Sequence, residues 1–375
     1  MTELDALLIL NAIGLSPARV RKLIDCVGSA ARVVTLNEAR VRELALEPLI
    51  PLKILEKIEH FPKDSYLKKE YNLVDRHRIS LIACHDAAYP RRLKEIFDPP
   101  LVLYVKGNPR ALEAPGIAMV GSRQATLYGL GVAERFAGEL CGVGLSIISG
   151  MARGIDAASH RGALKAKGTT LAVMGCGLNH IYPSENERLA EAILESGALV
   201  SELPMDMPPL AYNFPGRNRI ISGLSLGVIV VEASQKSGAL ITAEFALEQG
   251  REVFAIPGKV DQRNTQGVHR LIKEGAKLAT CLEDILEELK WPLKSTLRED
   301  SLSEESRSKG SSLNLTNQQK QVYQCLPLRQ DEPVHIDRLV DRSGLSVSSL
   351  AGVLFELELK KIIKQLPGKM FVRAG

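Results

Sequence analysis

Short apolar runs that alternate with amphipathic helical segments dominate the chain from about residue 115 onward. Each run is rich in Val, Ile, Leu and Ala and ends in glycine or small polar residues. Continuous apolar strands that alternate with helices are typical of a parallel sheet buried on both faces. We therefore predict an α/β fold with a doubly wound sheet, whose ligands bind at the carboxyl ends of the strands. The six predicted strands are 117–120, 145–149, 170–174, 198–201, 228–231 and 253–256.

The two ends of the chain depart from this alternating pattern, so we expect further domains on either side of it. Residues 1–80 read as helices and predict a helical domain similar to SAM or helix-hairpin-helix modules. Its segment GLSPARVRKLI at 14–24 fits a contact with a DNA backbone, but an ordinary turn between helices fits it too. Ser16 is placed to cap the helix that Pro17 begins.

Beyond the predicted α/β domain of 81–290, residues 291–313 are rich in Ser, Lys, Arg and Glu, with little to bury. Such a composition is typical of a linker. Residues 314–375 then show three helical patterns, followed by two short apolar pieces around Pro367 and Gly368. Helices followed by a hairpin predict a winged-helix-like domain.

Composition narrows the classes of protein that the chain can belong to. The 375 residues carry a net charge of +4, so a nucleic-acid surface would have to be a local basic patch. Six cysteines form no CxxC pair, which favours reduced thiols in the cytoplasm and argues against a zinc site. The first residues lack a basic signal-peptide start, and no apolar run reaches the length of a membrane span. We expect no metal, no cofactor and no membrane contact.

Glycine-containing loops follow the first three predicted strands and suggest an anionic ligand. Gly121, Ser122 and Arg123 come directly after the first strand, and backbone amides at a helix start favour an anion. The second loop, 149–156, contains Gly150, Arg153 and Gly154, and the third begins with Gly175. A single glycine turn is ordinary in an α/β sheet. Three in succession, two of them with arginine, predict a ligand that carries phosphate groups.

A later segment, 212–221, places an aromatic residue beside two arginines at a helix start. Phe214 can stack on a base while Arg217 and Arg219 hold phosphates, which is how proteins bind single strands. The alternative interpretation is that Phe214 fills the core and that the arginines pair with Glu232 or Glu244. Another loop with anion-binding character follows the strand 228–231, and it contains Lys236, Ser237 and Gly238.

Six blocks in this order closely resemble the DNA-processing protein A family (DprA, also called Smf). They are GSR at 121–123, SGMARGID at 149–156, GCGLNHIYP at 175–183, FPGRNRIISGLS at 214–225, EASQKSGALITA at 232–243 and VFAIPG at 253–258. The resemblance covers about residues 85–290, and the flanking domains are similar to those of longer family members.

The resemblance implies a non-enzymatic protein that binds single-stranded DNA in a basic pocket of an extended Rossmann-like domain, usually as a homodimer. It also implies that the protein protects incoming DNA during natural transformation and helps to load the RecA recombinase. The DNA contacts that it implies fall on the GSR loop, on Phe214, Arg217, Asn218 and Arg219, and on the basic residue of the KSG block, Lys236.

Two other functions remain open from the sequence. The first is a nucleotide-processing enzyme similar to nucleoside-monophosphate phosphoribohydrolases, with Arg219 and Glu244 as its catalytic pair. Its loop would require PGGxGT, whereas this chain has Gln235 to Leu240 without a double glycine. The second is a regulator that binds duplex DNA through the winged helix. However, the recognition helix at 346–359 is rich in Ser, Leu and Glu rather than in base-reading side chains.

Overall fold

The computed structural model describes five stretches of the chain, and contacts divide the chain into two compact units. The units are Met1–Thr296 and Leu297–Gly375. The predicted linker at 291–313 lies outside the described residues, apart from Trp291, and so do Pro367 and Gly368. The predicted domain boundaries stay predictions. The described residues are 1–291, 317–326, 334–359, 363–366 and 370–373.

Helices occupy the start of the first unit, as the sequence predicts. The first ends at Gly14, whose left-handed φ of 83° lets the chain turn, and the second begins at Pro17 and ends at Gly28. Ser16 is the N-cap residue of the second helix, but its side chain donates and accepts no capping hydrogen bond. The helices are α1 (Glu3–Ile13), α2 (Pro17–Val27), α3 (Ala30–Val34), α4 (Glu38–Glu43), α5 (Leu52–His60) and α6 (Lys63–His77).

A nine-stranded sheet in the order β1-β2-β6-β5-β4-β3-β7-β8-β9 forms the centre of the unit. All six predicted strands are present, and they pair in parallel from β6 through β8. An antiparallel pair, β1 and β2, extends one edge and was not predicted. The strands are β1 (Ile79–Ala83), β2 (Val102–Gly107), β3 (Gly116–Val120), β4 (Ser146–Ser149), β5 (Thr170–Val173), β6 (Ala198–Ser201), β7 (Gly227–Val230), β8 (Glu252–Ala255) and β9 (Lys277–Leu278).

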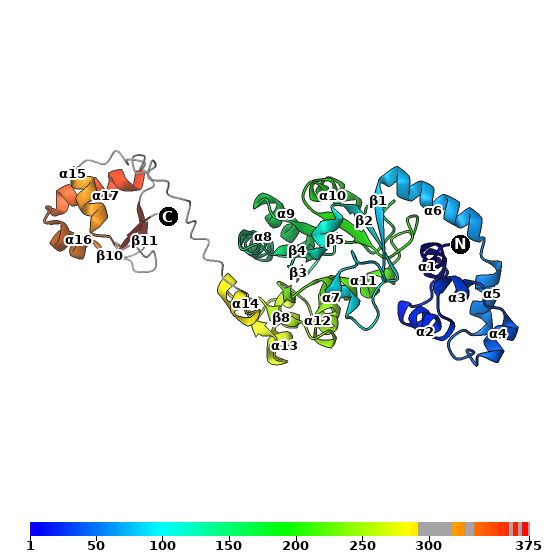
Figure 1. Cartoon of the computed structure of the whole chain (residues 1–375). Coiled ribbons are helices and arrows are strands. Elements are labelled where there is room, and N and C mark those ends of the chain that lie inside the picture. The colour runs from blue at the N-terminus through cyan, green and yellow to red at the C-terminus, as the bar shows by residue number, and fades with distance from the viewer. Residues whose placement is uncertain (292–316, 327–333, 360–362, 367–369, 374–375) are drawn as a thin grey trace. The chain divides into compact units, whose positions relative to one another are not determined.

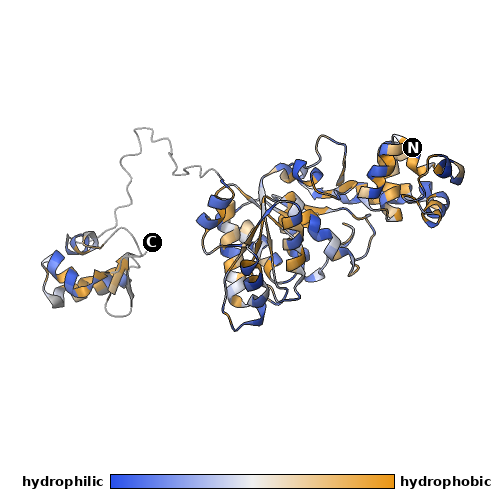
Figure 2. Cartoon of the chain, turned by 90° about the horizontal axis from the view of Figure 1, so that it is seen from below, coloured by the Kyte–Doolittle hydropathy of each residue, from blue (hydrophilic) through white to orange (hydrophobic). Residues whose placement is uncertain are grey.

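Helices cover both faces of this sheet (Figure 1). One core packs α7, α11, α12 and α13 against one face, and a second packs α8, α9 and α14 against the other. Figure 2 shows hydrophobic residues concentrated in the sheet between these layers. The helices are α7 (Arg91–Lys94), α8 (Leu127–Gly142), α9 (Ile155–Lys165), α10 (Glu187–Leu194), α11 (Asn213–Leu224), α12 (Gly238–Glu248), α13 (Gln266–Lys273) and α14 (Leu282–Glu288).

The N-terminal helices share a continuous hydrophobic core with the sheet. Leu7 and Leu10 of α1 belong to the same buried cluster as Tyr104 of β2 and Leu199 of β6. Buried Glu70 of α6 accepts a hydrogen bond from the Tyr104 hydroxyl at 2.7 Å. Polar and apolar contacts together therefore hold these helices against the sheet edge.

The second unit has the element order of a winged helix. Three helices pack around a core that includes Leu339 and Leu354, beside a small antiparallel sheet in the order β10-β12-β11. Ser346 accepts a hydrogen bond from the backbone N–H of Ser349 at 3.3 Å and so caps the last helix. The elements are α15 (Asn317–Gln324), β10 (Val334–His335), α16 (Ile336–Ser343), α17 (Val347–Leu359), β11 (Ile363–Leu366) and β12 (Met370–Arg373).

Candidate nucleic-acid interface

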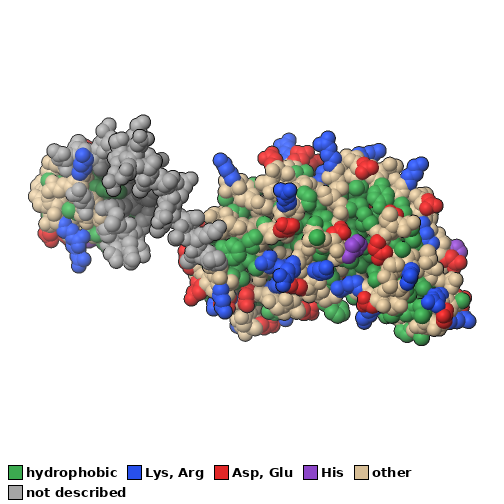
Figure 3. Space-filling model, viewed as in Figure 1, with side chains coloured by type: hydrophobic (Ala, Val, Ile, Leu, Met, Phe, Trp, Pro, Cys, Tyr) green, Lys and Arg blue, Asp and Glu red, His purple; other side chains and the backbone are tan. Residues whose placement is uncertain are grey.

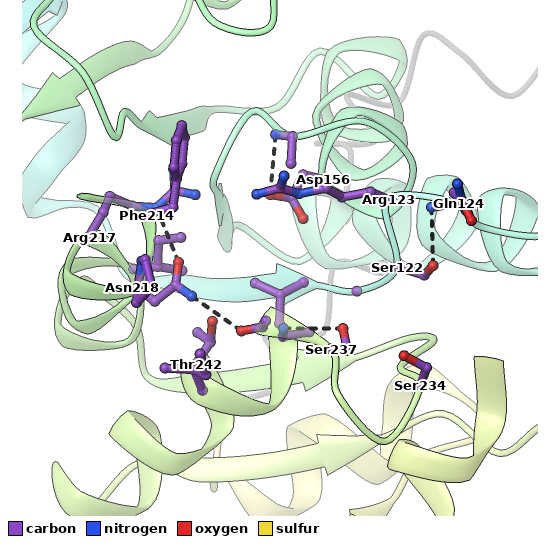
Figure 4. Close-up of a pocket in the computed structure, with 18 of the residues that line it drawn as sticks. Ser122, Arg123, Gln124, Asp156, Phe214, Arg217, Asn218, Ser234, Ser237 and Thr242 are labelled. Carbon is purple, nitrogen blue, oxygen red and sulfur yellow. Dashed lines mark hydrogen bonds between the residues drawn. The ribbon is translucent and has the colours of Figure 1, made fainter. Parts of the chain in front are cut away.

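The carboxyl ends of the parallel strands open onto a pocket of about 730 Å³. The chain runs from β3 through β4 and β5 to β6 on one side, and β7 then adds on the other side of β3. The loops after β3 and β7 thus diverge and leave a crevice, the usual ligand position in such sheets. Polar and aromatic side chains line it (Figure 4): Ser122, Arg123, Gln124, Asp156, Tyr182, Phe214, Arg217, Asn218, Ser234, Ser237, Thr242, Arg263 and Asn264.

The first predicted phosphate loop forms part of the pocket wall, because Gly121, Ser122 and Arg123 all line it. The helix start behind this loop, however, already holds a carboxylate of the chain itself. Buried Glu232 accepts hydrogen bonds from the backbone N–H and the hydroxyl of Thr126, the N-cap residue of α8. Because this carboxylate neutralises the positive end of α8, an anion at this loop depends on the side chains of Ser122 and Arg123.

The second predicted loop is also satisfied internally. The carboxylate of Asp156 accepts hydrogen bonds from the backbone N–H groups of Gly150 at 3.1 Å and Ala152 at 3.3 Å. Gly154 adopts a φ of 73° and caps α9. The exposed Arg153 guanidinium donates two hydrogen bonds of 2.5 Å to Glu185. The pocket lining does not include Gly150, Arg153 or Gly154, and their predicted contact with the ligand stays a prediction.

Phe214 stands in the pocket with aromatic and cationic neighbours. Its ring centroid lies 5.5 Å from that of Tyr182, and the rings are tilted by 46°. The guanidinium carbons of Arg123 and Arg217 lie 5.6 Å and 5.9 Å from the Phe214 centroid. Figure 4 shows the Arg123 side chain reaching across the pocket toward Phe214. The ring is half-buried and lines the cavity, so it does not simply fill the core.

Arg217 forms the floor of the pocket. Its Nη1 atom donates to the backbone oxygens of Gly150, at 2.9 Å, and Val173. A Cβ atom at Gly150 would clash with this guanidinium, so the glycine makes room for it. Burial lowers the pKa of Arg217 to about 10, and Asp156 opposes that decrease. Arg217 therefore stays charged at neutral pH. Burial raises the pKa of Asp156, and Arg217 opposes that rise.

The start of α12 faces the same cavity. Ser237 is its N-cap residue and, with Gly238, lines the pocket. Asn218 of α11 donates from Nδ2 to the Gly238 backbone oxygen at 3.3 Å and so links the starts of the two helices. Lys236 is exposed beside this loop but outside the pocket lining. Three arginines and one aspartate are the charged residues of the lining, so the cavity carries net positive charge.

Arg219 is not part of this cavity, in contrast to the sequence prediction. Its guanidinium donates two hydrogen bonds of 2.6 Å to Glu202, and Nε donates to the Asp98 backbone oxygen at 2.9 Å. Its side chain is 11% exposed. The alternative partners, Glu232 and Glu244, are also wrong: Glu232 binds Thr126, and Glu244 is an exposed residue of α12.

Seven polar or aromatic residues of the lining were not among the predicted contacts: Gln124, Asp156, Tyr182, Ser234, Thr242, Arg263 and Asn264. Arg263 and Asn264 lie after β8, and Asn264 donates from Nδ2 to the Gln124 backbone oxygen at 2.8 Å. Their position after a parallel strand was the available signal, because all carboxyl ends of parallel strands meet at one edge. Tyr182 was visible in the third glycine loop, but only the fold brings it against Phe214.

The proposed catalytic pair of a nucleotide-processing enzyme is not assembled. Arg219 is held by Glu202 and Asp98, and neither Arg219 nor Glu244 lines the pocket.

Within the described residues, no helix has the length and apolar character needed to cross a bilayer.

Comparison with known proteins places the chain among proteins of similar architecture. The sequence model described as "DNA recombination-mediator protein A" matches residues 80–290, more than half of the chain. Protein Smf of Escherichia coli is 41% identical over 320 residues, which cover 85% of this chain and 84% of that protein. The chain belongs to this family. DNA processing protein DprA of Bacillus subtilis is 48% identical over 212 residues, which cover 56% of this chain and 71% of that protein.

Solved structures of family members agree with the fold. DNA processing protein A from Streptococcus pneumoniae matches with a TM-score of 0.66 and 37% identity, over 77% of this chain and 98% of that chain. The same protein from Helicobacter pylori, described with a unique single-stranded DNA binding mode, matches with a TM-score of 0.52 and 28% identity. That match covers 57% of this chain and 96% of the other. The DprA winged-helix model matches residues 306–369. The predicted fold class is thereby confirmed.

Proposed function

We propose that this family member binds single-stranded DNA in the pocket at the ends of β3 and β7, without making or breaking a covalent bond. The observation that carries this proposal is the position of Phe214 between Arg123 and Arg217. An exposed ring face accepts a base of any identity, and the guanidinium groups hold the flanking phosphates. Figure 3 shows Lys and Arg side chains gathered near the middle of one face of the larger unit, beside hydrophobic ones.

The proposed DNA contacts follow from the geometry of the lining. Arg123, Ser122 and Arg263 face phosphates from the loop side, and Phe214 with Tyr182 supplies the stacking surface. Gly150, Arg153 and Gly154 then support the pocket rather than touch DNA, and exposed Lys236 meets the strand at the pocket rim. The remaining proposed contacts are Gly121, Arg217, Asn218, Ser237, Gly238 and Asn264.

The proposed role in the cell is to protect incoming single strands and to help load the RecA recombinase during natural transformation. The family description as a recombination mediator and the single-stranded DNA binding of the Helicobacter pylori relative support this role. We further propose that the protein acts in the cytoplasm, as a homodimer and without a cofactor.

A salt titration of binding to single-stranded and duplex oligonucleotides tests the proposal. The wild type should prefer single strands strongly. Arg123→Ala should weaken binding to every sequence and reduce the log–log salt slope by about 0.7 for each lost phosphate contact. Arg153→Ala is the matched control, because Arg153 is equally exposed but paired with Glu185 outside the pocket.

Equal affinity for single strands and duplexes would contradict the proposal. An unchanged salt slope for Arg123→Ala would remove Arg123 from the phosphate contacts. Release of free base from a nucleoside monophosphate would instead support the enzyme alternative, although the structure does not assemble its predicted pair.

A further inference from the structure

The aromatic side chain of Phe97 is exposed on the surface near α11. Phe97, in the segment between α7 and β2, is 87% exposed, the largest exposure of any aromatic residue in the described part of the chain. Its neighbours Ile96 and Pro99 are buried. An isolated exposed apolar residue is ordinary. What distinguishes Phe97 is how its backbone is held.

Two hydrogen bonds to the backbone and one to a side chain hold the Phe97–Asp98 segment in place. Arg21 of α2 donates from Nη2 to the Phe97 oxygen at 2.6 Å, and Arg219 donates from Nε to the Asp98 oxygen at 2.9 Å. The Asp98 carboxylate accepts from the backbone N–H of Ala18 at 2.6 Å. A ring on a fixed backbone loses little conformational entropy when a ligand stacks on it, so this one is preorganised for contact.

Basic residues lie near the Phe97–Asp98 segment. Arg21 and Lys22 lie on the same face of α2 as Ala18, because residues three and four apart are neighbours on a helix. Lys94, the last residue of α7, is exposed and lies three residues before Phe97. Two carboxylates nearby are engaged: Asp98 contacts Ala18 and Arg219, and Glu95 pairs with Arg91.

The surface between Phe97 and the pocket is open. Arg219 donates from Nη1 to the Gly216 oxygen at 3.0 Å, so the Asp98 segment lies beside the first turn of α11. Pro215 and Gly216 of that turn are exposed, Pro215 lines the pocket, and a Cβ at Gly216 would meet nothing within 4 Å. The side chain of Arg219 thus links the Phe97–Asp98 segment to the turn of α11 that carries Phe214.

We propose that a DNA strand leaving the pocket crosses α11 at Pro215 and Gly216 and stacks a base on Phe97. The basic residues Arg21, Lys22 and Lys94 then hold its phosphates, so the N-terminal helices contribute to the DNA path. This inference rests on the proposed function. A single strand fits better than a protein surface, because the exposed residues known near this segment are basic rather than apolar. Aromatic rings interleaved with basic residues are the usual single-strand platform.

Binding of oligothymidylates of increasing length, from about 5 to about 30 nucleotides, tests this path. Phe97→Ala should bind the shortest strands like the wild type and the longest about tenfold more weakly, the effect of one lost stacking contact. Phe97→Trp should restore the long-strand affinity and Phe97→Leu should not. Val260→Ala is the matched control, since Val260 is 86% exposed in the loop after β8.

Fluorescence reports the contact directly, because the chain has a single tryptophan, Trp291. In a Trp291→Phe background, the Phe97→Trp variant should be quenched by long strands and not by the shortest ones. Phe214→Ala should weaken binding at every length. If the wild type binds no single strand, the proposed function and this path both fail.

If the wild type binds and the Phe97 variants follow it at every length, the path alone is overturned. If Phe97→Ala changes the sedimentation coefficient but not DNA binding, the surface around Phe97 is an interface between two copies of the chain. That result would also overturn the proposal.

Discussion

The sequence predicts the same role for Arg217 and Arg219, but helix geometry gives them different roles. Arg217 and Arg219 are two positions apart on α11, and residues at that spacing do not share a helix face. Arg217 turns to the strand ends and becomes the pocket floor, while Arg219 turns to Glu202 and Asp98. Since Phe214 and Arg217 are three apart and do share a face, their joint presence in the pocket was predictable. The spacing alone excluded Arg219 from it.

Phe214→Ala should weaken single-strand binding by about 1–3 kcal/mol with little change in the salt slope, because a stacking contact releases no counterions. Anisotropy titrations at several salt concentrations measure both quantities. Phe214→Tyr should keep most of the affinity. A loss of thermal stability without a loss of affinity would instead make Phe214 a structural residue that packs on Tyr182.

His160 should make the stability depend on pH. It is fully buried, its Nδ1 lies 2.7 Å from the Thr170 hydroxyl, and its Nε2 has no hydrogen-bond partner among the described residues. Burial lowers its pKa to about 3. The unfolded chain therefore binds the proton first, and stability falls as pH drops below about 6.5. Between pH 7 and 5 the loss should be about 2 kcal/mol.

Urea unfolding at pH 7, 6 and 5 measures this loss. His160→Asn retains a donor for Thr170 but does not titrate, so its stability should fall by about 2 kcal/mol less than that of the wild type over this range. Parallel pH profiles for the two proteins would show that another group causes the decrease.

At the scale of elements, the helix starts divide into two kinds. The start of α8 binds a carboxylate of the chain itself, Glu232, whereas Asp156 in the first turn of α9 accepts hydrogen bonds from the loop before that helix. The starts of α11 and α12 open onto the pocket through Phe214 and Ser237. The glycine loops were recognisable from the sequence, but the carboxylate behind the first of them comes from a residue far along the chain. Glu232 is 106 residues from Thr126, so no local pattern could reveal this pairing.

The ion pairs of Arg219 should hold α11 to the N-terminal helices. Glu202 accepts from Asn11 Nδ2 at 2.7 Å through its backbone oxygen, and Asp98 accepts from Ala18. Arg219→Ala strands two largely buried carboxylates and should cost about 3 kcal/mol of unfolding free energy. A double-mutant cycle with Glu202→Ala should show strong coupling. For strands short enough to fill only the pocket, the salt slope should stay that of the wild type.

If Arg219→Ala reduces the salt slope as much as Arg123→Ala does, Arg219 contacts DNA after all. Additive stability losses in the cycle would mean that Arg219 and Glu202 act independently, despite the two hydrogen bonds between them.

At the scale of the molecule, the strand pattern predicted the fold class, whereas the strand order came only from the structure. The runs at 117–120 and 228–231 are separated by more than a hundred residues, yet β3 and β7 pair directly. That pairing creates the crevice. The antiparallel β1 and β2 escaped prediction because Ile79–Ala83 follows a helix directly and reads as its continuation. Arg263 was not predicted as a lining residue because the strand order decides which residues surround it, and the sequence does not reveal that order.

The separation into two units gives the last prediction. The pocket lies entirely within Met1–Thr296, and α17, the helix in the recognition position, has no Lys or Arg from Val347 to Leu359. A chain ending at Trp291 should therefore keep the single-strand affinity and salt slope of the full protein. In urea unfolding, the truncated chain should lack only the transition of the smaller unit. A large loss of affinity on truncation would show that the winged helix contacts DNA, which its apolar and acidic composition disfavours.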